Sequence, residues 1–202
     1  ANRIVDDDWK MCYHKASNLL EVTAMTLVNI FDAAREGDRD AFRKFYSGNI
    51  NEVDPYSNFN LLQLAVTSTE NSEGRLAIIR FLLENGIDLN FRDKKYGRNA
   101  LHVSFFGFRK GDINHLRKQT ELLISAGMDV NATDKFDAIP LKYAITISKH
   151  PTEEMKEIYV MLLRAGSDYK KKDTFQKSCL DYAQEYSWRN GFMDIAKESE
   201  SM

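Results

Sequence analysis

A hydrophobic pattern with a glycine at its end recurs along the chain. Leucine pairs at Leu82-Leu83, Leu122-Leu123 and Leu162-Leu163 are each soon followed by a glycine, at Gly86, Gly127 and Gly166. The pairs themselves are evenly spaced along the sequence. Adjacent leucines add bulk to the inward stripe of an amphipathic helix, and glycine readily adopts the left-handed conformation that ends one. The pattern therefore predicts three helices that end at these glycines, with leucines such as Leu123 and Leu163 facing the core.

A second motif follows each of these endings and a weaker copy of the ending at residues 47–51, and it predicts another helix. It occupies residues 60–65, 99–104, 139–144 and 178–183, and its third residue is always leucine, at nearly even intervals: Leu62, Leu101, Leu141 and Leu180. Its sixth residue is small, which lets neighbouring helices pack closely. Ile30 sets the phase of one earlier unit, upstream of Leu62. We therefore expect five repeating units, with residues 67–75, 106–116 and 148–153 lying between helices.

The two ends of the chain are expected to cap this array. Three aspartates at residues 6–8 favour the start of a helix from about Trp9 to Ala24, and its apolar residues would cover the first unit. We therefore divide the chain into a capping helix at residues 1–26 and a repeat domain at residues 27–202. The expected units are approximately residues 27–54, 55–93, 94–133, 134–172 and 173–202.

The repeating motifs resemble the ankyrin repeat, whose signature is Thr-Pro-Leu-His-x-Ala in a unit of two helices and a β-turn. His102 keeps the histidine of that signature and Pro140 keeps its proline. The resemblance covers nearly the whole chain and implies an all-α solenoid with projecting β-turn fingers. It also implies a protein-binding module that is not an enzyme, with His102 bracing a turn.

Composition and motifs exclude several other functions. The 28 basic and 30 acidic residues give a net charge of −2, which argues against a nucleic-acid or membrane-surface binder that works by bulk charge. The longest uncharged apolar run, residues 158–163, is far shorter than the roughly 20 residues of a membrane span. Phosphate-binding, dinucleotide-binding, metalloprotease and hydrolase motifs are absent from the sequence. We expect no cofactor, metal or small-molecule substrate, and no disulfide between Cys12 and Cys179, which belong to opposite ends of the array.

The fingers carry the candidate binding residues, because repeats differ most where they meet partners. Tyr96, Phe136 and Phe175 occupy equivalent positions on successive fingers, and large exposed aromatic clusters tend to mark interaction sites. The alternative is that these rings fold back to cover the next finger. The full candidate set is Tyr56, Phe59, Tyr96, Arg98, Lys135, Phe136 and Phe175 on the fingers, with Phe106 and Tyr186 on the adjoining helices.

Long repeat units in a compact array resemble bacterial single-domain ankyrin proteins, some of which are immunity proteins encoded beside toxic effectors such as type VI lipases. This resemblance implies a monomer that binds and neutralises a cognate effector encoded nearby. The alternative is a scaffold or adaptor that recruits a cellular or host protein. The chain begins at Ala1 without methionine. We therefore expect a preceding piece, such as a signal peptide or lipoprotein leader, to have been removed by processing or by the choice of expressed segment. The compartment stays open between periplasm and cytoplasm.

Overall fold

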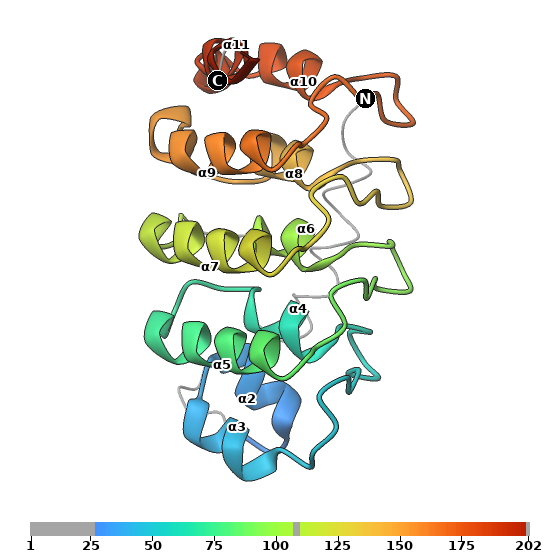
Figure 1. Cartoon of the computed structure of the whole chain (residues 1–202), viewed down its shortest axis with the longest axis vertical. Coiled ribbons are helices and arrows are strands. Elements are labelled where there is room, and N and C mark those ends of the chain that lie inside the picture. The colour runs from blue at the N-terminus through green and yellow to red at the C-terminus, as the bar shows by residue number, and fades with distance from the viewer. Residues whose placement is uncertain (1–26, 107–109, 201–202) are drawn as a thin grey trace, which may run out of the picture.

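Five pairs of helices stack on one another in the part of the chain that the computed structural model describes, residues 27–106 and 110–200 (Figure 1). The pairs are α2 (Ile30–Glu36) with α3 (Arg39–Phe45), α4 (Leu61–Ala65) with α5 (Ser72–Glu84), α6 (Ala100–Ser104) with α7 (Ile113–Ser125), α8 (Pro140–Thr146) with α9 (Thr152–Arg164), and α10 (Cys179–Glu185) with α11 (Phe192–Glu200). A short 3-10 helix, η1 (Ser187–Arg189), joins the last two. No β-strand occurs in the described ranges, so the predicted all-α solenoid is confirmed.

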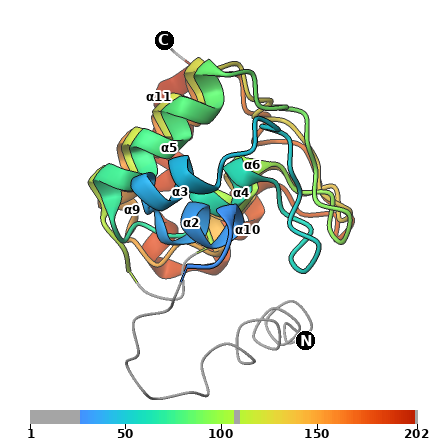
Figure 2. The same cartoon turned by 90° about the horizontal axis from the view of Figure 1, so that it is seen from below.

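The first and second helices of the units form two layers. Each first helix packs on the next first helix, as α4 does on α6, and each second helix packs on the next second helix, as α7 does on α9. The loops that precede the first helices project together on the side away from the second helices (Figure 2). This stacking buries a continuous apolar core and leaves one rim of loops available for contacts.

Local sequence explains where the helices begin and end. Asn60, Asn99 and Ser178 each accept a hydrogen bond from the third residue of their helix, whose side chain in turn accepts from the cap backbone. At α8, Pro140 occupies the first turn instead. Helices α5, α7 and α9 end two residues before Gly86, Gly127 and Gly166, whose φ angles of 79°, 89° and 88° are left-handed, as predicted.

The leucine that is buried in each leucine pair is not always the one that we expected. Leu82, Leu123 and Leu162 are fully buried, whereas Leu83, Leu122 and Leu163 are half-buried. The buried leucine always lies four residues before the glycine that ends the helix. The prediction was therefore correct for Leu123 and wrong for Leu163. The pair in α7 is shifted by one residue relative to the glycine, so counting from pair to pair gave the wrong face.

The segments expected between helices, residues 67–75, 106–116 and 148–153, lie there only in part. Among the described residues, loops at 66–71, 105–106, 110–112 and 147–151 lie between the helices of these units, but Arg75, Leu116 and Glu153 already belong to the second helices. Each of α5, α7 and α9 is 13 residues long, whereas the first helices have five or seven. The additional length therefore extends the second-helix layer as well as the loops.

Predictions for the chain ends fall partly beyond what the structure describes. The expected capping helix at residues 1–26 and Cys12 lie outside the described residues. Cys179 is a free, buried thiol whose pKa is raised by burial. At the other end α11 packs along α9, where the Phe192 ring meets Tyr159 edge to face at 5.1 Å.

Candidate protein-binding surface

A buried aspartate holds the base of every finger. We define the four fingers as residues 54–59, 93–98, 134–138 and 173–177, which begin at Asp54, Asp93, Asp134 and Asp173. The aspartate carboxylates accept a hydrogen bond from the N–H two residues later at 3.1, 3.0, 2.8 and 2.9 Å. Their own N–H groups donate across the finger to Phe59, Arg98, Ala138 and Lys177 at 2.8 to 3.0 Å. These bonds close each finger into a tight turn.

Most of these aspartates also bind a side chain that orients the finger. Asp134 and Asp173 accept hydrogen bonds from the hydroxyls of Tyr143 and Tyr182, on the first helices of the same units, at 2.5 and 2.6 Å. Asp54 pairs with Arg35 of α2 at 3.1 Å. Burial, followed by the negative charge of Asp134, raises the pKa of Tyr143 above its ordinary value. The tyrosine hydroxyls therefore remain protonated donors.

Sequence reasoning missed this aspartate. It recurs eight residues before Leu62 and Leu101, and seven residues before Leu141 and Leu180. The changing interval hides it, because the first two fingers contain one more residue than the last two. Its recurrence beside the aligned leucines is nevertheless a signal that the sequence carries.

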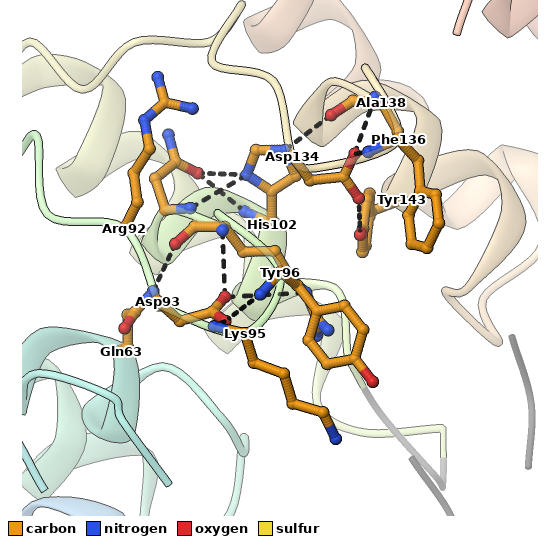
Figure 3. Close-up of polar contacts among 12 residues, drawn as sticks. Gln63, Arg92, Asp93, Lys95, Tyr96, His102, Asp134, Phe136, Ala138 and Tyr143 are labelled. Atoms are coloured by element: carbon orange, nitrogen blue, oxygen red, sulfur yellow. Dashed lines mark hydrogen bonds and ion pairs between the residues drawn. The ribbon is translucent and has the colours of Figure 1, made fainter. Parts of the chain in front are cut away.

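The second, third and fourth fingers are joined by hydrogen bonds. The N–H of Lys135 donates to the Tyr96 carbonyl at 2.8 Å, and the N–H of Thr174 donates to the Phe136 carbonyl at 2.9 Å. Beneath them, Gln63 Nε2 donates to the Arg98 carbonyl at 2.7 Å, and His102 Nε2 lies 3.0 Å from the Ala138 carbonyl (Figure 3). His102 therefore braces the following finger, as the family resemblance implied. The fingers are fixed relative to one another before any partner arrives.

The aromatic residues on the fingers contact one another and also keep solvent-exposed surface. Tyr56 is 94% exposed and Phe175 is 54% exposed, whereas Tyr96 and Phe136 are half-buried. The Phe136 and Phe175 rings lie 6.1 Å apart at an angle of 31°. Lys135 Nζ lies 4.0 Å from the centre of the Tyr96 ring. The rings thus do cover neighbouring fingers, and their remaining surface is available for binding.

Arg98 differs from the expectation of an accessible finger-tip side chain. It is only 8% exposed and lies at the base of the second finger, with its guanidinium carbon 3.8 Å from the Tyr96 ring centre and 4.8 Å from that of Phe106. The cause is tertiary, since Phe106 follows α6 and meets the finger only when the unit folds. Phe106 is half-buried and packs edge to face on Tyr143 at 5.5 Å.

The structure joins six of the nine candidate residues into one row. Cation–ring and ring–ring contacts run from Phe106 through Arg98, Tyr96, Lys135 and Phe136 to Phe175. We call these six residues the aromatic row. The other three candidates lie outside it: Tyr56 projects into solvent, Phe59 packs partly against the core, and Tyr186 faces Trp188 at 5.0 Å.

Other kinds of site are not found in the described ranges. Residues 27–106 and 110–200 hold no group of three or more histidine, cysteine or acidic side chains placed to bind a metal ion. No helix in that part of the chain is long and apolar enough to cross a membrane.

Comparison with known proteins identifies the repeating unit. Residues 57–94 match the family model of the ankyrin repeat. No curated protein matches the chain. The matched segment contains the end of the first finger, helices α4 and α5, and the start of the second finger. The same order of finger, short helix, long helix and left-handed glycine recurs in the two following units. Residues 57–94 are therefore an ankyrin repeat, and the described part of the chain folds as an all-α ankyrin solenoid, an architecture that serves as a protein-binding module.

Proposed function

We propose that the chain binds one protein partner on the face formed by its fingers and first helices, with the aromatic row at the centre of the contact. The observation that carries this proposal is the row itself. Aromatic and arginine side chains supply most of the binding energy in protein interfaces. Here they are gathered on adjacent fingers and the helix beside them, and the fingers are already rigid.

Rigidity supports a tight and specific contact. Backbone hydrogen bonds between fingers, and the bonds from Gln63 and His102 beneath them, order the surface in advance. A surface that is already ordered loses little conformational entropy on binding, so more of the contact energy remains as affinity. This property favours a dedicated partner over a series of loosely bound ones.

Replacing Tyr96 or Phe136 by alanine is expected to weaken partner binding by at least about 1 to 2 kcal/mol, because each change removes a ring from the centre of the contact. The melting temperature should stay nearly unchanged, since both rings are half-buried at the surface. The measurement is affinity capture from the native organism with quantitative mass spectrometry of the retained proteins. Lys118→Ala, an exposed change on α7, is the matched control.

Two results would contradict this prediction in different ways. Early melting of both variants would mean that the rings serve packing. Normal capture by both variants at native stability would place the contact elsewhere, and the segment after α6 would then be tested next.

In its more specific form, the proposal is that the partner is a toxic effector encoded nearby and that the chain is its immunity protein, with a type VI secretion lipase as one such effector. The resemblance to bacterial single-domain ankyrin proteins supports it, and so does the rigid surface suited to one partner. Co-expression tests it: the chain should restore growth of cells that produce the neighbouring effector, and a Tyr96→Ala, Phe136→Ala variant should not. If growth is not restored and capture instead retains an unrelated cellular protein, the adaptor function holds.

A further inference from the structure

Arg98 is a buried cation without the hydrogen-bond partners that buried arginines ordinarily have. Its Nε is buried and donates to no described residue, and its carboxylate contact, Asp93 Oδ2 at 3.8 Å from that Nε, is too long for a hydrogen bond. No described residue accepts a hydrogen bond from its terminal nitrogens either. The rings of Tyr96 and Phe106 lie over the guanidinium group. Its N–H donors, which point outward in the plane of the group, therefore contact neither an acceptor nor a ring face.

Two other buried arginines of the chain show what a purely structural role looks like. Arg189 donates to the carbonyls of Ile145, Ser148 and His150 at 2.5 to 2.8 Å. Arg75 donates to the carbonyls of Glu70 and Ala65 at 2.7 and 3.2 Å, and also to that of Arg35. Both guanidinium groups are fully engaged within the protein. Leaving the donors of a buried charged group without hydrogen-bond acceptors costs free energy, and the ion pair with Asp93 and the ring contacts supply no acceptor within hydrogen-bond distance, so the state of Arg98 requires another explanation.

Exposed lysines lie on the fingers around Arg98. The second finger contributes Lys94 and Lys95, and the third contributes Lys135, all of them exposed. Lys135 Nζ lies over the Tyr96 and Phe136 rings at 4.0 and 5.0 Å, and it forms no ion pair with a carboxylate in the described part of the chain. The same two fingers hold three aspartates, of which Asp93 and Asp134 are buried at the finger bases and Asp137 is exposed, so the exposed side chains at the tips are mainly cationic.

We propose that Arg98 and Lys135 bind a carboxylate of the partner, and that the partner presents it on an acidic segment lying across the second and third fingers. A planar guanidinium edge matches the two oxygens of a carboxylate, and the flanking rings of Tyr96 and Phe136 suit an apolar side chain beside it. This inference rests on the proposed function and adds the chemistry of the partner.

A carboxylate suits this cluster better than a nucleic acid does. Nucleic-acid binding draws its affinity from many phosphate contacts, commonly about 6 to 10. The cluster offers one deeply placed guanidinium and three lysines on two turns, and the chain as a whole carries a charge of −2. A short acidic peptide needs no more cations than these.

The test uses a phage-displayed library of random dodecapeptides selected on the full chain, followed by fluorescence anisotropy of the enriched peptides. We expect enriched peptides that combine Asp or Glu with an apolar residue, and at least about tenfold weaker binding when the acidic residues become Gln or Asn. Arg98→Gln and Lys135→Glu should each weaken binding by at least about tenfold. Lys118→Glu, the same charge reversal on an exposed site of α7, should leave binding unchanged. Lys135 is exposed, so its variant reports on binding even if Arg98→Gln destabilises the fold.

The outcomes separate this inference from the proposed function. Neutral or basic peptides that require Tyr96 and Phe136 would overturn the carboxylate site and leave the binding surface in place. Acidic peptides that bind Lys135→Glu as tightly as the native chain would also overturn it. Labelled oligothymidylate could also bind more tightly than any peptide and lose this binding in the Lys135→Glu variant. That result would mean that Arg98 and the lysines around it bind nucleic acid and not a carboxylate. A library that yields no ligand, or only ligands indifferent to Tyr96 and Phe136, would count against both proposals.

Discussion

Replacing Leu162 by alanine is expected to lower the free energy of unfolding by about 2 to 5 kcal/mol. Leu162 is fully buried in α9, within the core cluster that runs through the stack. Truncation removes its contacts and leaves a cavity that neighbouring side chains fill only in part. Urea denaturation followed by circular dichroism measures the loss, and the midpoint should shift while the slope of the transition stays the same.

Leu163 provides the matched control, because it is the same residue type, next in sequence and in the same helix. Leu163 is half-buried, so its replacement by alanine should cost about 1 kcal/mol. In α5, α7 and α9 the buried leucine lies four residues before the glycine that follows the helix. The difference in stability between the two variants tests whether this spacing, and not the position within the leucine pair, identifies the core residue. Equal losses for Leu162→Ala and Leu163→Ala would show that this register is wrong.

Acidification is expected to destabilise the protein through His102. This side chain is fully buried, and burial is the main reason that its pKa is lowered from 6.5 to about 4. Nδ1 lies 3.2 Å from the Asn99 backbone nitrogen and 2.7 Å from Asn99 Oδ1, and Nε2 lies 3.0 Å from the Ala138 carbonyl oxygen. Between pH 6.5 and about 4 the unfolded chain therefore binds a proton that the native chain does not.

The sign of the effect follows from that difference in bound protons. Stability is fully present above pH 6.5 and falls as the pH drops toward 4, by a total of about 3 kcal/mol from this group. His115 contributes in the same direction, because burial lowers its pKa too. The measurement is the free energy of unfolding in urea as a function of pH between about 7.5 and 4.

The chain itself suggests the control for His102. Gln63 occupies the equivalent position one unit earlier, where its side chain accepts from the Asn60 N–H and donates to the Arg98 carbonyl. His102→Gln should therefore preserve stability at neutral pH within about 1 kcal/mol and make the loss on acidification smaller by about 2 to 3 kcal/mol. An unchanged pH dependence in this variant would mean that His102 is not the titrating group.

Features governed by neighbouring residues were predictable from the sequence. A left-handed stop depends on glycine and on little else, so Gly86, Gly127 and Gly166 marked the helix ends correctly. The recurrence of the short-helix motif likewise predicted α4, α6, α8 and α10. Because each repeat contacts only its neighbours, repetition along the chain translates directly into stacking in space.

Features that depend on contacts between units were not predictable in the same way. Which leucine of a pair faces the core depends on a rotation of about 100° per residue, so an offset of one position reverses the answer. Arg98 looked accessible because it belongs to a finger, but Phe106 and Tyr96 enclose it once α6 and the finger come together. The aspartates at the finger bases become evident only from their bonds to backbone and tyrosine.

The sequence by itself thus determined the repeating units, the helical solenoid and the fingers as the variable surface, since these follow from periodicity, from local backbone preferences and from the resemblance to the ankyrin repeat. Only the tertiary structure decided that six of the candidate side chains form one row, and that a buried guanidinium within it lacks hydrogen-bond acceptors. The physical reason is that burial and pairing are properties of contacts between residues of different units. Tyr96, Lys135 and Phe175 belong to three successive units and lie far apart along the chain, yet stacking of the units brings them into one row.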